Sequence, residues 1–580
     1  MLLAPHDDSR WPCRHSHINL SKGQVGLQEM RVRSLVAASA AIAVLALSAV
    51  MSMPAFAQDT SAAAQTPTDA SATAPSSDNS QPSSGTAPAA TPDTALPSAA
   101  PPLTVVQTTP QPVAATPVVE SIRTKLADFD KASSSGDVSA LVAFYNERGE
   151  PLWMTDMGLS NEGLAVVDEI LRADEWGLSS AAFDLPASGD LPTSPEAAAA
   201  TEIKLDLAIL KYARFARGGR TDPAKLSKLY GMTPTLRDPK TVMVEIAAAD
   251  APDIYLRSLH PKHEQFQLLQ QALVNARAES EPGAKRANTQ KIIVNMERWR
   301  WMPEDLGSLY VWLNIPSYIV QVVNDGKTIY TDKIVVGELK YATPVFSAYL
   351  KSIVFNPEWT VPPIVVREDL LPNLRGGGGL FSRNTAILDQ HELKVKYNGR
   401  LVDAGSINWN SVNMGAISFV QAPGPRNVLG KVKFVYPNPY SVYMHDTIRV
   451  GLFDKEARSE GHNCPRVGNP GKIAAVVLAA DQNTPQADVD KLLATGYNSA
   501  VNITHHVPVH TSYFTALVDD QGKVQTFADI YKLDPVVAEA IIGKEPKPEA
   551  VADNGDAKPK RQKHSNSVPS GLAPDIATNP

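Results

Sequence analysis

A cysteine and a histidine in one structured stretch are the residues of this sequence best suited to chemistry. His445 stands in the run YMHDT and Cys464 in the run GHNCPR, with eighteen residues between them. If YMHDT is a strand, Tyr443 and His445 share one face and Met444 points to the other. An imidazole beside a thiol can accept its proton, and the resulting thiolate is a strong nucleophile. Spacing does not establish contact, so a structural histidine remains the alternative to a Cys/His pair.

The N-terminus bears on what that cysteine means. From Met30 the chain shows a basic start, an apolar run over residues 35–50 and an Ala-x-Ala sequence before Gln58. This pattern predicts a secretory signal with translation starting at Met30, so that residues 1–57 are an upstream extension and signal; an uncleaved membrane anchor is the alternative. Cys13, the other cysteine in the sequence, then lies outside the mature protein. We expect the folded part in the periplasm, where an unpaired cysteine is unusual.

The residues around Cys464 favour a reactive thiol. A lone cysteine is often just a small buried apolar residue. Here Glu460, His462, Asn463 and Arg466 surround it. They predict an accessible turn in which a nearby cation lowers the pKa of the thiol.

Composition divides the rest of the chain. The formal net charge is −7, and the lack of a basic excess argues against a nucleic-acid partner. Residues 58–118 are an Ala/Pro/Thr/Ser-rich run that cannot bury enough apolar surface to fold, which predicts a disordered linker. Residues 545–580 form a charged, proline-bearing tail that we also expect to be disordered.

Two folded regions lie between these segments. Over residues 119–278 apolar residues recur at helical spacing, which predicts a helical domain. Over residues 291–540 short Val/Ile/Tyr-rich runs alternate with turns such as Asn324-Asp325-Gly326, which predicts a mainly β domain. The fold class predicted is therefore α+β, with His445 and Cys464 in the β part.

The same residues resemble a known family, the L,D-transpeptidases with a YkuD-like catalytic domain, which cross-link bacterial peptidoglycan. The family pattern is a histidine, a variable stretch, and Ser/Thr-His-Gly-Cys or Ser-Ser-Gly-Cys followed by an apolar residue and arginine. His445, His462, Cys464 and Arg466 take the matching positions. Longer runs, among them NMERWRWMP, LYVWLNIPSY and PVHTSYFTALVDDQGKVQTFADIY, resemble the large YcbB-type branch, and together they cover most of residues 120–540.

The resemblance implies a two-step acyl transfer in a domain with an inserted lid at about residues 367–413. Cys464 attacks the carbonyl that joins the third residue of a tetrapeptide stem to its terminal D-Ala, and His445 transfers the proton. An amine of a second stem then resolves the thioester into a 3-3 cross-link. Peptidoglycan stem peptides are the implied partners and carbapenem-type compounds the implied inhibitors; the N-terminus is a candidate membrane tether, and no metal or cofactor is expected.

The resemblance also implies a substrate and oxyanion site. Three positions depart from the pattern, and the first is Gly461, which stands where the family has Ser or Thr. Asn463 stands where the family has glycine, and we expect it to tolerate a left-handed backbone there. Pro465 removes one N–H next to the nucleophile, which leaves the amide of Cys464 and its upstream neighbours for the oxyanion. Arg466 is a candidate for binding a stem carboxylate, and structural pairing with Asp446 or Glu460 is the alternative. The implied site residues are Tyr443, His462, Asn463 and Arg466.

Other functions use the same pair of residues. Water in place of the amine gives an L,D-carboxypeptidase. A cysteine peptidase or a sortase-like acyl transferase would also use Cys464 and His445. A non-catalytic cell-wall-binding homologue is the remaining alternative, and it is kept open by Asn463 and Pro465. The segment between the two folded regions is also too short for the small peptidoglycan-binding module that is common in the YcbB-type branch.

Overall fold

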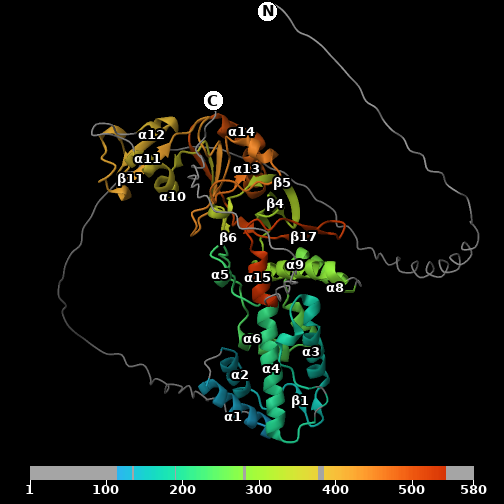
Figure 1. Cartoon of the computed structure of the whole chain (residues 1–580). Helices are drawn as coiled ribbons and strands as arrows, with labels where there is room; N and C mark the ends of the chain where they lie inside the picture. Colours follow the sequence, from blue (N-terminus) through green and yellow to red (C-terminus); the bar gives the residue numbers. More distant parts are fainter. Residues whose placement is uncertain are drawn as a thin grey trace, which may run out of the picture. The chain divides into compact units, whose positions relative to one another are not determined.

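The computed structural model describes residues 114–543 except 133–135, 188, 190, 279–281 and 377–384. The predicted signal, the linker up to residue 113 and the tail from residue 544 lie outside these residues. No helix in the described part is long and apolar enough to cross a membrane. Helices come first and a large sheet follows, so the predicted α+β class is confirmed (Figure 1).

Local capping explains where the helices of the first half begin. The longest, α4 (Pro195–Gly218), starts where Ser194 accepts a hydrogen bond from the amide of Ala197. The helix α6 (Pro239–Ala247) starts in the same way at Asp238. Apolar side chains between Val119 and Leu259 form one core, whereas those of α8 (Glu264–Ala278) and α9 (Pro282–Trp301) belong to the core of the large sheet. The other helices and the short hairpin here are α1 (Pro117–Ala132), α2 (Gly136–Asn146), β1 (Met154–Thr155), β2 (Gly158–Leu159), α3 (Asn161–Leu171), α5 (Pro223–Leu226) and α7 (Pro252–Ser258).

A ten-stranded sheet dominates the second half. Its order is β15-β7-β12-β13-β14-β5-β4-β3-β16-β6. The predicted turn at Asn324-Asp325-Gly326 is confirmed: it joins β4 to β5, with φ of 47° at Asp325 and 75° at Gly326, as a tight hairpin requires. The strands are β3 (Leu309–Asn314), β4 (Ile319–Asn324), β5 (Lys327–Val335), β6 (Phe346–Tyr349), β7 (Ser352–Phe355), β12 (Val432–Val435), β13 (Met444–His445), β14 (Arg466–Val467), β15 (Ser499–Asn502) and β16 (Pro508–Ser512).

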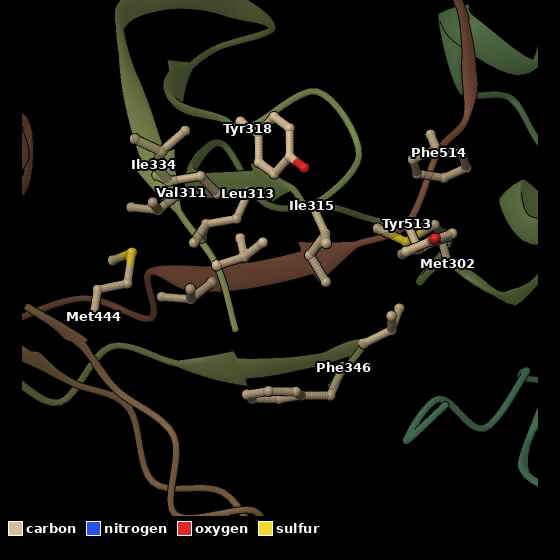
Figure 2. Close-up of a cluster of buried hydrophobic side chains, with 14 of the residues drawn as sticks. Met302, Val311, Leu313, Ile315, Tyr318, Ile334, Phe346, Met444, Tyr513 and Phe514 are labelled. Carbon is tan, nitrogen blue, oxygen red and sulfur yellow. The ribbon is translucent and has the colours of Figure 1, made fainter. Parts of the chain in front are cut away.

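The core of this half lies on the face of the sheet opposite the candidate site. Figure 2 shows Val311 and Leu313 of β3, Ile334 of β5 and Met444 of β13 in one apolar cluster. The helix α13 (Pro470–Gln482) packs on β4 and β5 and adds to the cluster. Met444 is fully buried there, which anchors the short strand that carries His445. Beyond the sheet lie α14 (Gln486–Ala494), β17 (Ala516–Val518), β18 (Val524–Thr526) and α15 (Asp534–Ile542).

A second, smaller sheet carries its own core. Its order is β10-β9-β11-β8, and with the helices between its strands it makes up what we call the small-sheet subdomain, residues 359–421. The predicted lid, residues 367–413, falls inside it, and residues 377–384 of that lid lie outside the described residues. A separate apolar cluster holds the subdomain together. Its elements are β8 (Trp359–Thr360), α10 (Pro363–Val365), a π-helix (Val366–Leu370), α11 (Leu371–Gly376), α12 (Ala386–Gln390), β9 (Leu393–Tyr397), β10 (Arg400–Val402) and β11 (Ile417–Gln421).

A buried tyrosine hydroxyl links two buried carboxyl groups of α4. The Tyr145 hydroxyl lies 2.8 Å from Oε1 of Glu202 and 2.8 Å from Oδ2 of Asp206. A hydroxyl has one hydrogen, so it can donate to only one of them, and the other carboxyl must carry a proton and donate to it. Glu202 accepts backbone N–H groups of Trp153 and Met154, which favours its charge. Asp206 is therefore the protonated partner, and burial raises its pKa well above the usual value.

We expect Asp206→Asn to flatten the pH dependence of stability. A carboxyl whose pKa is raised in the folded state stabilises the fold fully below its unfolded pKa of about 3.9, and this contribution is lost as the pH rises toward the folded value. Asparagine keeps a donor for Tyr145 and has no proton to lose. The variant should therefore gain stability relative to wild type, by up to about 1.4 kcal/mol for each pH unit in this window.

Urea unfolding from pH 4 to pH 8 measures this effect. The matched control is Asp250→Asn, which changes an exposed carboxylate and should follow the wild-type curve. A difference between Asp206→Asn and wild type that stays constant with pH would show that Asp206 is ionised in the folded protein.

Candidate active site

Strand pairing places three polar side chains in one row across the sheet. In β13, His445 pairs with Lys433 of β12 on one side and with Arg466 of β14 on the other. Directly paired residues project to the same face. Tyr443 precedes His445 by two residues, so an extended backbone brings it to the same face. Cys464 comes from the bend before β14 and lines the same cavity as His445. The alternation predicted for YMHDT is confirmed, because Met444 is buried in the opposite core while the Tyr443 and His445 rings lie 5.6 Å apart.

All the residues that the sequence points to line one cavity of about 270 Å³. The opposite wall comes from the small-sheet subdomain and includes Trp359, Ile364 and Asp369. The cavity thus lies between the large sheet and that subdomain. The predicted residues that line it are Tyr443, His445, His462, Asn463, Cys464 and Arg466.

The electrostatics of Cys464 differ from the sequence prediction. The sequence predicts an accessible thiol with a lowered pKa, but the residue is only half-exposed and burial raises the pKa of the thiol. The backbone amide of Tyr443 and the charges of Arg466 and Lys433 lower it, as expected of cations, without overcoming the desolvation. The resting group is a neutral thiol, and its Sγ lies 4.0 Å from Oδ1 of Asn463 as a donor.

His445 is held as a neutral imidazole. Its Nδ1 forms a short hydrogen bond with the carbonyl oxygen of Asp446, and because a carbonyl can only accept, the proton lies on Nδ1. Burial, together with the charges of Arg466 and Lys433, lowers the pKa of His445 to about 3, although the hydrogen bond to the Asp446 carbonyl acts in the opposite direction. The backbone N–H of His445 donates to the carbonyl of Pro465 at 3.1 Å. Because the ring proton lies on Nδ1, Nε2 of His445 carries a lone pair, as a general base requires.

The turn before the nucleophile corrects another expectation. Sequence reasoning assigned a left-handed backbone to Asn463, but this residue is not among the described residues with positive φ, whereas Gly461 has φ of 73°. Glycine adopts this conformation at low cost, so it takes the strained position two residues earlier. Asn463 is left free to place its side chain beside the thiol.

His462 and Arg466 make mainly structural contacts in this state. The His462 ring stacks on Tyr341 at 4.4 Å. The Tyr341 hydroxyl in turn donates a short hydrogen bond to Glu368 of the small-sheet subdomain. Arg466 donates to the backbone carbonyl of Glu460 at 2.6 Å. Within the described ranges, no three His, Cys, Asp or Glu side chains are grouped to hold a metal ion.

Comparison with known families agrees with this arrangement. Residues 308–486 match the family model described as the L,D-transpeptidase catalytic domain, YkuD, and residues 139–273 match the model described as the Scaffold domain. The chain carries a YkuD L,D-transpeptidase catalytic domain. The YkuD match includes both His445 and Cys464.

Individual relatives are more distant. A Haemophilus influenzae protein that carries the provisional name L,D-transpeptidase is 31% identical over 255 residues, which cover 44% of this chain and 50% of that protein. The chain thus spans about half the length of this curated relative. A solved structure described as the Ldtfm–avibactam carbamoyl enzyme aligns with 53% of this chain and 98% of its own at 10% identity, and its TM-score of 0.18 supports no argument.

Side chains that sequence reasoning missed hold the nucleophile loop of the YkuD domain in place. The Thr343 hydroxyl donates to the carbonyl of Asn463 at 2.9 Å and accepts the amide of Gly337 at 3.0 Å. The Tyr531 hydroxyl donates to the carbonyl of Gly337 at 2.6 Å. A Cβ on Gly337 would lie 2.0 Å from a backbone oxygen and 3.0 Å from Cα of Asn463, so this close approach requires glycine. Thr343 and Tyr531 carry no sequence signal for these roles, because Asn463 and Gly337, their respective partners, are distant in the chain.

We expect Thr343→Val to loosen the loop that holds Cys464. Valine keeps the shape but leaves the buried carbonyl of Asn463 without its donor, which costs about 1–3 kcal/mol of stability. The rate at which iodoacetamide alkylates Cys464, followed by peptide mass, should change as well.

Thr343→Ser is the matched control, since it keeps the hydroxyl and loses only a methyl group. It should retain the wild-type alkylation rate. Equal alkylation rates in Thr343→Val and wild type would mean that the bond to Asn463 does not position the nucleophile.

Proposed function

We propose that this protein is an exported peptidoglycan L,D-transpeptidase that forms 3-3 cross-links through a thioester on Cys464. The observation that carries the proposal is that Cys464 and a neutral His445 line the same cavity of a YkuD domain. The substrate we propose is a tetrapeptide stem that ends in D-Ala.

In the first step the Cys464 sulfur attacks the carbonyl that precedes the terminal D-Ala. The thiol proton passes to Nε2 of His445, and the carbon–sulfur bond forms. When the carbon–nitrogen bond breaks, the same proton goes to the departing nitrogen, so D-Ala leaves with a neutral amino group. The amide of Cys464 is the proposed donor to the oxyanion, because Pro465 has no N–H to offer.

In the second step a side-chain amine of another stem attacks the thioester. His445 accepts a proton from that amine, the new amide bond forms and the sulfur leaves. The proton on His445 then restores the thiol. Water in place of the amine gives a carboxypeptidase, and the small-sheet subdomain, whose residues form one wall of the cavity, is the proposed lid that keeps water out.

The cell location follows from the reaction we propose. Peptidoglycan cross-linking takes place outside the cytoplasmic membrane, which fits the secretory signal predicted before Gln58. We therefore propose a periplasmic enzyme, with the N-terminal segment as a candidate tether.

We expect Cys464→Ala to abolish both release of D-Ala from a tetrapeptide stem and acylation by a carbapenem, seen as an intact-mass increase. His445→Ala should lower the rate of D-Ala release by about 10² to 10⁴, the usual contribution of a general base. Analysis of the cross-linked products separates a transpeptidase from a carboxypeptidase.

A matched control accompanies these variants. His506→Ala removes an exposed histidine and should keep full activity. Wild-type D-Ala release by Cys464→Ala would refute the thioester mechanism. Wild-type protein that binds stem peptides without releasing D-Ala would instead indicate a non-catalytic cell-wall-binding protein.

A further inference from the structure

A lysine outside the family motif lies in the same row as the candidate base. Lys433 of β12 pairs directly with His445 of β13, so the two side chains project from the same face of the sheet. Lys433 is half-buried, which is uncommon for a lysine without a partner. Its position therefore calls for an explanation.

The ring of Tyr443 fixes the Lys433 ammonium. Lys433 Nζ lies 4.0 Å from the centroid of that ring, within the range of a cation–π interaction. Burial and the Cys464 charge raise the pKa of Tyr443, so the ring stays a neutral phenol and keeps an electron-rich face for the cation. The ammonium is thus held in place before any substrate arrives.

Lys433 and Cys464 act on each other electrostatically. The negative charge that forms on Cys464 raises the pKa of Lys433 against the effect of burial, and the Lys433 charge lowers the pKa of the thiol. Arg466 acts on the thiol in the same direction, but it also donates to the carbonyl of Glu460. Lys433 supplies a second cation from the opposite side of His445.

Other ionisable groups surround the thiol. On the large sheet, His445, Tyr443 and Tyr436 lie around it, and all three interact with the same cations or with the thiolate. Three more ionisable side chains line the cavity: the carboxyl group of Asp369, the guanidinium of Arg449 and the imidazole of His462. Among these groups Lys433 and Arg466 are the cations that lower the pKa of Cys464.

We propose that Lys433 is a positioning residue for acyl transfer, a fixed positive charge that stabilises the Cys464 thiolate before attack and again when the sulfur leaves the thioester. The proposal deepens the proposed function and rests on Cys464 as the nucleophile. Lys433 is not among the residues that line the cavity, so it acts through Cys464 and not on the substrate. It also disfavours a positive charge on His445, so the proton that His445 accepts is returned readily.

The test measures the thiolate directly and needs no peptidoglycan. The full chain carrying Lys433→Met is alkylated with iodoacetamide from pH 7 to pH 10.5, and modification of the Cys464 peptide is followed by mass. We expect the midpoint of the pH profile to rise by about one unit, which makes alkylation about tenfold slower at a pH below both midpoints. Lys433→Arg keeps the charge and should restore most of the rate.

Lys431→Met is the matched control, since Lys431 lies just before the same strand with an exposed side chain. It should keep the wild-type profile. A Lys433→Met protein with wild-type melting and a wild-type midpoint overturns the proposal, as does a midpoint that rises equally in Lys431→Met. If the methionine variant does not fold, Lys433→Gln removes the charge but keeps a polar group at the end of the side chain, and the same two outcomes apply.

The proposed function fails separately. If wild-type protein releases no D-Ala while Lys433→Met still shifts the alkylation profile, the transpeptidase assignment is wrong and the role of Lys433 toward the thiolate stands. If wild-type protein releases D-Ala and the alkylation profile of Lys433→Met does not shift, the transpeptidase assignment stands and the role proposed for Lys433 is wrong.

Discussion

The pairing of two very short strands determines the site. β13 and β14 are two residues each, and a single directly paired couple, His445 with Arg466, sets their register. A hydrogen bond from the backbone N–H of His445 to the carbonyl of Pro465 strengthens this pairing. Because side chains alternate along a strand, a slip of one residue would send His445 into the core and Met444 into the cavity. The flanking strands β12 and β5 and the burial of Met444 prevent that slip.

Desolvation and local charge act in opposite directions at the thiol and together at the imidazole. Burial raises the pKa of Cys464 while Arg466 and Lys433 lower it; burial and both cations lower the pKa of His445. The pair therefore rests as thiol and neutral imidazole instead of an ion pair. A resting thiol is less open to oxidation than a thiolate, which suits an unpaired cysteine in the periplasmic location that we propose.

Sequence reasoning reached the features that depend on local pattern. Helical periodicity, the Asn-Asp-Gly hairpin and the opposite faces of Met444 and His445 follow from neighbours in the chain, and the motif resemblance pointed to the YkuD domain. It missed features set by contacts between distant segments. The register between β12 and β13 places Lys433 beside His445. The hydrogen bond from Thr343 to Asn463 joins residues that are far apart in the sequence. The direction of the Cys464 pKa depended on burial, which no composition around the cysteine reveals.

Tyr443 connects the small-sheet subdomain to the electrostatics of the nucleophile. Its ring packs against the apolar cluster of that subdomain, while the next residue, Met444, belongs to the cluster of the large sheet. The same ring supports the Lys433 ammonium. A second link runs from Glu368 through Tyr341 to the stacked ring of His462. Movement of the subdomain away from the large sheet would uncover the Tyr443 ring and admit water to the cavity, and water weakens the interaction of both cations with the sulfur. The effect of the two cations on the sulfur is therefore strongest when the subdomain covers the cavity, which is also the state in which burial raises the pKa of the thiol.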